Sequence, residues 1–146
     1  MLKDLTSENL IKLNIEATDW EDAVRKAAQP LLDAGKVKQS YVDDIIVGAK
    51  ESGPYFVLAQ HVALPHARPE AGALESAIGI ATLKTPVEFG SEANDPVKYL
   101  FRLSARNNTE HLEALADLAE RLEDENFFKM LDNATGAEEV LAYLNK

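Results

Sequence analysis

The amino-acid sequence predicts a single α/β domain in which a mixed β-sheet is flanked by helices on both faces. Two observations support this prediction. Short β-prone runs alternate with longer segments whose apolar residues recur every three or four positions, as in amphipathic helices. In addition, the 146 residues contain no internal repeat, low-complexity stretch or Gly/Ser-rich linker, so residues 1–146 are expected to form one domain.

Two amphipathic helices are predicted in the N-terminal third of the chain. The first begins near Trp20 and ends at Gly35, since glycine commonly follows the last turn of a helix. Pro30 lies inside this pattern and is expected to kink or split the helix, because proline has no N–H to donate. The second helix spans Gln39–Lys50, and the Ser-Gly-Pro sequence shortly after it should end it.

Four β-prone runs occupy the middle of the chain. They are Tyr55–Leu58, His61–Leu64, Ser76–Leu83 and Val97–Leu103. In the last run, Val97 and every second residue after it are apolar, which predicts that these side chains share one face of a strand. The dipeptide Thr85-Pro86 is expected to turn the chain after the third run.

The C-terminal third is predicted to be helical. The polar cluster Asn107–Thr109 can cap a helix whose apolar residues repeat at helical spacing. The residues expected to face inward are Leu112, Leu115, Leu118, Ala119 and Leu122. Two shorter helices are expected at Asn126–Leu131 and Ala137–Leu144.

The composition narrows the functional classes. Fifteen Lys and Arg against twenty-five Asp and Glu give a net charge of −10, so the domain is a poor candidate for binding nucleic acid or an anionic membrane. The absence of cysteine excludes a disulfide scaffold, a cysteine-ligated zinc site and a cysteine nucleophile within this chain. No secretory signal and no bilayer-spanning apolar run are visible, so a cytoplasmic protein is expected.

His66 is the most distinctive candidate for chemistry. It follows an apolar run in the sequence HVALPHARPE, where Pro65 and Pro69 stiffen the backbone on either side. An imidazole presented from the rigid end of a strand suits a general base, a metal ligand or a nucleophile. The alternative is a structural histidine that is bonded to a carbonyl at the strand end.

His111 is the second candidate, in the first turn of the helix expected after Asn107–Thr109. Free N–H groups and the positive end of the helix dipole favour an anion there, including a phosphoryl group, and would help to keep the imidazole neutral. A structural role stays open on the residues alone, with Asn108 as the cap and His111 merely occupying the helix start.

Other kinds of site find little support. His61 lies five residues before His66, and this odd spacing would place the two side chains on opposite faces of a strand. Glu70 and Glu75 lack the spacing of a metal motif, so no metal site is predicted. The sequence has no G-x-S-x-G, P-loop or G-x-G-x-x-G motif, so neither a serine hydrolase nor a nucleotide site is indicated, and no cofactor is expected.

Two separate motifs resemble those of one known family. The run QHVALPHARPE (residues 60–70) resembles the active-site signature of type-2 enzyme IIA domains of the phosphoenolpyruvate-dependent sugar phosphotransferase system (PTS), the mannitol/fructose group. The run EHLEALADLAERL (residues 110–122) resembles the family's second histidine and the leucine-rich helix after it. The resemblance extends from about Leu5 to Leu144, and the continuation His-Ala-Arg-Pro looks most like the ascorbate-type branch.

The resemblance implies a phosphoryl relay. His66 would take a phosphoryl group on Nε2 from the phosphocarrier HPr and pass it to a cysteine of a cognate enzyme IIB, during sugar uptake through the membrane subunit IIC. His111 would stabilise the phosphoryl group. Lys50, Arg68 and Arg106 are the candidate phosphate-facing cations. An enzyme IIA does not contact the sugar, so L-ascorbate is suggested by the branch alone.

Two other functions stay open. Nitrogen-type enzyme IIA domains use the same histidine chemistry for regulation, and a non-catalytic binding domain would need His66 only as a structural residue. A relay of either kind predicts that the His66 and His111 rings lie at the same edge of the sheet, about 4–8 Å apart. His61 is expected to lie farther from the phosphoryl position.

Overall fold

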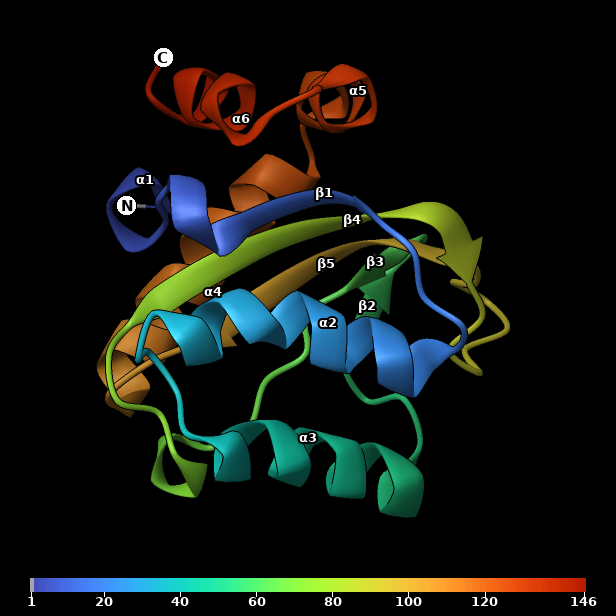
Figure 1. Ribbon diagram of the computed structural model, residues 1–146, viewed down its shortest axis with the longest axis vertical. Coiled ribbons are helices and arrows are strands. Elements are labelled where there is room, and N and C mark those ends of the chain that lie inside the picture. Colours follow the sequence, from blue (N-terminus) through green and yellow to red (C-terminus); the bar gives the residue numbers. More distant parts are fainter. Residues whose placement is uncertain (1) are drawn as a thin grey trace.

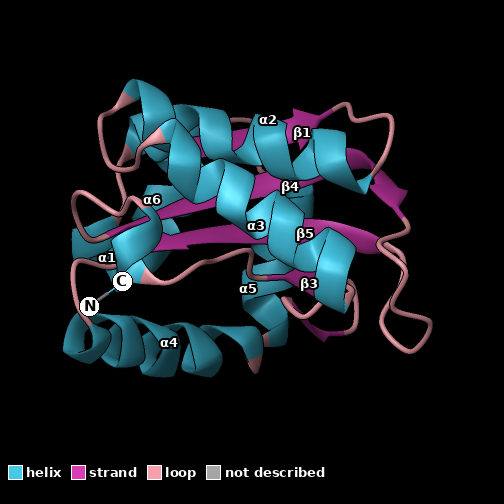
Figure 2. Ribbon diagram, turned by 90° about the horizontal axis from the view of Figure 1, so that it is seen from below, coloured by secondary structure: helices cyan, strands magenta, loops and turns pink. Residues whose placement is uncertain are grey.

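The computed structural model describes residues 2–146, which form a five-stranded mixed sheet between two layers of helices (Figure 1, Figure 2). The strands are β1 (Ile11–Ile15), β2 (Val57–Ala59), β3 (Val62–Ala63), β4 (Ala77–Val87) and β5 (Val97–Ser104). Their spatial order is β1-β4-β5-β3-β2. The central pair β4 and β5 is antiparallel, whereas β1 is parallel to β4 and β3 is parallel to β5. The predicted fold class is therefore confirmed.

Helices cover both faces of this sheet (Figure 1). One face carries α2 (Trp20–Asp33) and α3 (Gln39–Ser52). The other face carries α1 (Leu2–Leu5), α4 (Asn108–Leu122), α5 (Glu125–Asn133) and α6 (Ala137–Leu144). Two short 3-10 turns, η1 (Glu8–Leu10) and η2 (Pro69–Ala71), complete the described elements.

The hydrophobic core has two layers, one on each face of the sheet. In β4, Ile78 and Ile80 pack toward α4, α5 and α6, whereas Ala81 and Leu83 pack toward α2 and α3. Successive side chains of a strand point to opposite faces, so a strand covered on both faces is apolar almost throughout. The long buried stretch at the start of β4 is the result.

Two predicted breaks in the chain are wrong. α2 is not split at Pro30 but continues through it to Asp33 as one helix, and both Pro30 and Leu31 are buried. The burial of this last turn outweighs the one hydrogen bond that an N–H at position 30 would have donated. β4 likewise continues through the dipeptide Thr85-Pro86 to Val87. The pairing of β4 with β1 ends at Leu83, so no neighbouring strand on that side requires an N–H from Pro86.

Three other details differ from the sequence prediction. The edge strand β1 was not predicted, because its run IKLNI is only five residues long and contains two polar residues. Val97 packs in the α2–α3 layer, while Tyr99 and the alternate residues after it pack in the opposite layer, since the register of β5 shifts near its start. In α4, Leu112 and Ala119 are exposed, and Ala114 and Leu118 are the buried residues.

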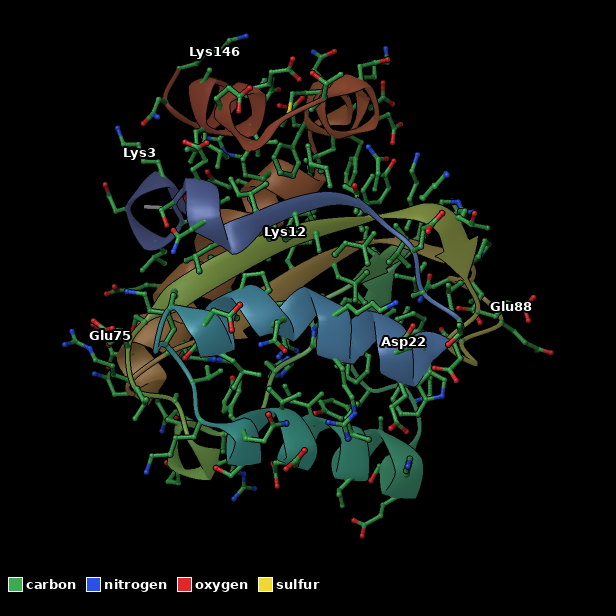
Figure 3. All side chains as sticks on the ribbon, in the orientation of Figure 1. Lys3, Lys12, Asp22, Glu75, Glu88 and Lys146 are labelled. Carbon is green, nitrogen blue, oxygen red and sulfur yellow. The ribbon has the colours of Figure 1, made fainter. Side chains whose placement is uncertain are left out.

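Most charged side chains lie on the outside of the fold, whereas Arg102 is buried. Figure 3 labels Glu75 and Glu88 at opposite sides of the molecule, and both residues are exposed. Within residues 2–146, no helix combines the length and the apolar character that crossing a bilayer requires.

Candidate functional site

His66 lies on the segment Leu64–Ala67, directly after β3. Its ring Nδ1 is 2.7 Å from the carbonyl oxygen of Leu64. Because a carbonyl can only accept a hydrogen bond, the neutral ring carries its proton on Nδ1 and keeps a free lone pair on Nε2. The backbone two residues upstream thereby fixes the tautomer and leaves Nε2 as the nucleophilic atom.

The backbone around His66 is held by side chains from other elements. The Tyr55 hydroxyl donates to the His66 carbonyl at 2.6 Å, and Nη1 of Arg102 donates to the Pro65 carbonyl at 3.3 Å. The Tyr55 ring also contacts the His66 ring edge to face, with the centroids 5.8 Å apart. The segment Leu64–Ala67 is therefore held in place by Tyr55 and Arg102 as well as by its own proline.

Tyr41 joins the two segments that carry the histidines. Its hydroxyl accepts from the Ala67 N–H at 3.2 Å and donates to the Leu103 carbonyl at 2.7 Å. Ala67 follows His66, and Leu103 lies at the end of the strand that leads to α4 and His111. The Tyr41 side chain is buried, so this link is shielded from water.

His111 is the fourth residue of α4, which begins at Asn108. Asn107 is the cap, with its side chain accepting from the Glu110 N–H at 2.9 Å, so the expected Asn108 cap is wrong by one residue. The His111 N–H bonds to the Asn107 carbonyl at 3.1 Å, which leaves the imidazole as the group that His111 can offer to a ligand. Burial, and then the neighbouring His66, lower the pKa of His111, so its ring is neutral at physiological pH.

The His66 and His111 ring centroids are 5.4 Å apart, within the predicted range. The sheet explains this meeting. Since β3 and β5 are neighbouring parallel strands, their carboxyl ends meet at one edge, and the segments that follow them begin side by side. Open α/β sheets commonly bind ligands in such a crevice.

An open cleft lies over the two rings. The residues that line it include an apolar wall from α3, acidic side chains and one cation. They are Asp44, Val47, Gly48, Glu51, Ser52, Tyr55, His66, Ala67, Arg68, Pro69, Asn108 and His111. The His66 and His111 side chains are half-buried, so both are accessible to a partner from the cleft.

The three candidate cations differ in position. Arg68 is exposed and lines the cleft. Lys50 is paired with Glu21 at 3.0 Å, and Arg106 binds both carboxylate oxygens of Glu110, at 2.6 and 3.1 Å. Of these three, only Arg68 is among the residues that line the cleft over His66.

His61 belongs to the turn between β2 and β3, not to a strand as expected. Its φ is +68°, and its Nδ1 is 2.7 Å from the Pro96 carbonyl oxygen. The residue does not line the cleft. Within the described part of the chain, no three His, Cys, Asp or Glu side chains gather as a metal site would require.

Sequence reasoning overlooked Tyr41, Tyr55, Asn108 and Arg102. Asn108 was treated as a cap, whereas it lines the cleft beside His111. A signal for Arg102 is present in the sequence, since an arginine interrupts the apolar run VKYLFRLS of a buried strand. Because burial of an ion is costly, a charged residue inside a buried strand indicates a specific structural or functional role.

Comparison with known proteins matches the arrangement to one family. The model of the phosphoenolpyruvate-dependent sugar phosphotransferase system EIIA 2 family matches residues 4–146. The chain belongs to this family. An ascorbate-specific PTS system EIIA component from Salmonella typhimurium is 36% identical over 143 residues, covering 97% of this chain and 93% of the relative. The corresponding protein of Escherichia coli K12 is 35% identical over 147 residues, covering 99% and 96%.

Solved structures of PTS enzyme IIA proteins share the fold. The mannitol-specific cryptic enzyme IIA from Escherichia coli has a TM-score of 0.86 and 32% identity, covering 97% of this chain and 98% of that one. Enzyme IIA of the mannitol system, solved in complex with phosphorylated enzyme IIB, has a TM-score of 0.83 and 29% identity, covering 96% of each. This PTS EIIA protein is accordingly a phosphoryl-transfer component of the phosphotransferase system.

Proposed function

We propose that this PTS EIIA protein carries the phosphoryl group on Nε2 of His66. The observation that carries the proposal is the bond between Nδ1 and the Leu64 carbonyl, which exposes a nucleophilic Nε2 in an open cleft. The Nε2 lone pair forms the new N–P bond while the N–P bond of the phosphorylated donor breaks, and that electron pair returns to the donor's ring nitrogen. The ring keeps its Nδ1 proton, and the Leu64 carbonyl stabilises the positive charge that the ring gains.

His111 is proposed to assist this transfer. Its neutral imidazole can donate one N–H to a phosphoryl oxygen across the 5.4 Å between the ring centroids. Asn108 and Arg68 line the same cleft and can supply an amide N–H and a cation to the other oxygens. Charge on the equatorial oxygens is what a phosphoryl-transfer site must stabilise.

The proposed partners are two proteins of the relay. Phosphorylated HPr is the donor and a cysteine of enzyme IIB is the acceptor, in line with the solved complex of the mannitol IIA with phosphorylated IIB. This chain contains no cysteine, so the acceptor thiol must belong to another chain or domain. The membrane subunit IIC would take part only indirectly, and the relay would operate in the cytoplasm.

The proposed system transports L-ascorbate or a related sugar acid. The relatives named above as ascorbate-specific, which match nearly the whole chain, support this proposal. They also favour transport over the regulatory alternative. The nitrogen regulatory IIA protein of Neisseria meningitidis is 24% identical with a TM-score of 0.80, a likeness that supports the fold alone.

A reconstituted relay tests the proposal. The wild-type chain is incubated with phosphoenolpyruvate, enzyme I and HPr, and acid-labile phosphate is mapped by mass spectrometry. His66→Ala should abolish labelling, whereas the matched control His61→Ala should be labelled like the wild type. His111→Ala should be labelled but pass phosphate to enzyme IIB about 10²–10³-fold more slowly. Undiminished labelling of His66→Ala would refute the proposal.

A further inference from the structure

Arg102 is a fully buried cation in the middle of the fold. It lies in β5 with 0% of its surface exposed. Its neighbour in the register of the sheet is Gly79, and a Cβ on Gly79 would lie 3.5 Å from the Arg102 Cβ and 3.3 Å from the Leu10 carbonyl oxygen. The absence of a side chain at Gly79 therefore makes room for a long side chain at the centre of the sheet.

The guanidinium of Arg102 is only partly paired. Nη1 donates to the Pro65 carbonyl at 3.3 Å, while Nε and Nη2 have no hydrogen-bond partner among residues 2–146. The ionisable groups that couple to its titration are the phenols of Tyr41 and Tyr55, which stay neutral at physiological pH because burial raises the pKa of each. Burial lowers the pKa of Arg102 to about 10, which still leaves the guanidinium charged at neutral pH.

Such an arrangement is unfavourable in the absence of a nearby anion. Buried charges are normally paired, because removing an ion from water is costly unless an opposite charge compensates it. The Pro65 carbonyl that Arg102 holds belongs to the peptide bond that leads into His66. A phosphoryl group on His66 would add negative charge one residue beyond the carbonyl that Arg102 holds, and the low-polarity interior would screen the attraction little.

We propose that Arg102 is a positioning residue for His66 and the buried counter-charge of its phosphorylated form. The inference rests on the proposed phosphorylation of His66. Arg102 acts through the Pro65 carbonyl and through its field, while residues of the cleft contact the phosphoryl group. By linkage, a charge that favours the phosphorylated state must also make that state more stable toward unfolding.

Two substitutions separate charge from packing. Arg102→Met removes the charge at similar length, and Arg102→Lys retains it. We expect Arg102→Met to lower the equilibrium constant for transfer from phosphorylated HPr about tenfold, and Arg102→Lys to stay within about threefold of the wild type. The deficit of Arg102→Met should be the same at low and high salt, because the charge is buried. The deficit of Arg68→Gln, at the exposed cleft, should shrink with salt.

Thermal stability gives a readout that a purely structural role would not predict. Unphosphorylated Arg102→Met should melt at or above the wild-type temperature, because an apolar side chain replaces an unpaired buried ion. Phosphorylation should raise the melting temperature of the wild type and leave that of Arg102→Met unchanged. The matched control is Phe101→Leu, a buried neighbour that packs in the opposite core layer, and it should keep the wild-type transfer constant.

Each outcome decides the proposal. If Arg102→Met does not fold, Arg102→Gln replaces it, since Gln keeps a donor for the Pro65 carbonyl and lacks the charge. A wild-type transfer constant for the charge-free variant overturns the proposal, as does an equal gain in melting temperature on phosphorylation. If the wild-type chain is not labelled on His66 at all, the proposed function itself fails. That failure is seen with the wild-type chain alone, so it can be told apart from a failure of the Arg102 proposal, which appears only in the variants.

Discussion

Removal of the Tyr41 hydroxyl should weaken the fold and the site together. Tyr41→Phe loses two buried hydrogen bonds, one from the Ala67 N–H at 3.2 Å and one to the Leu103 carbonyl at 2.7 Å. At about 1 kcal/mol each, the free energy of unfolding should fall by about 2 kcal/mol. For a chain of this size, that corresponds to a melting temperature about 4–8 °C lower.

The assay is urea unfolding followed by the relay. With a slope of about 1–3 kcal/mol per M, the unfolding midpoint of Tyr41→Phe should fall by about 1 M while the slope is unchanged. Transfer from phosphorylated HPr should slow about tenfold, because the segment that carries His66 loses its link to the strand before α4.

Tyr99→Phe is the matched control. The Tyr99 hydroxyl donates to Asp132 at 2.6 Å in the opposite core layer, and neither residue lines the cleft over the histidines. This variant should lose about 1 kcal/mol of stability and transfer phosphate at the wild-type rate. The reasoning is refuted by a Tyr41→Phe midpoint equal to that of the wild type, or by equal slowing of transfer in both variants.

Three other predictions concern pH, core packing and a turn. Folding lowers the pKa of His111, so the unfolded chain binds more protons and the free energy of unfolding falls as pH drops through about 6.5. Urea unfolding at a series of acid pH values should show a smaller fall in this free energy for His111→Asn than for the wild type. Phe127→Ala, at a fully buried ring, should cost about 3–5 kcal/mol in urea unfolding with transfer per folded molecule unchanged. Gly72→Ala should lose about 1–3 kcal/mol by calorimetry, since φ is +139° and the new Cβ would lie 2.8 Å from the Ser40 hydroxyl oxygen.

The sequence predicts the layered fold because the apolar periodicities are strong. β5 and α3 extend by one and two residues beyond their predicted ends, and α2 begins at the predicted Trp20 and ends two residues before Gly35. Pro30 and Pro86 were misread because packing and strand pairing decide whether a proline ends an element. At Pro30 the burial of the last helical turn outweighs one lost hydrogen bond, and at Pro86 no residue of β1 is paired with β4. Local sequence reveals neither condition.

Part of the candidate site could also be predicted from the sequence. His66 and His111 could be singled out, since proline neighbours and a helix start are local features. Their meeting at one sheet edge follows from the parallel pairing of β3 with β5, which the sequence did not specify. The partner of Lys50, Glu21, is distant in sequence and is brought near only by the fold, whereas the pairing of Arg106 with Glu110, four residues on, was a local signal that the sequence reasoning did not use.

The bond from His66 Nδ1 to the Leu64 carbonyl also bears on the direction of the reaction. The acceptor lies two residues upstream in the same rigid segment, so it is already in place whichever protein approaches the cleft. In the proposed relay, both half-reactions would pass through the same ring. Because the acceptor of Nδ1 is in place for both, the proposed carrier would need no change of tautomer between them, and net flow would be set by the supply of donor and the removal of product.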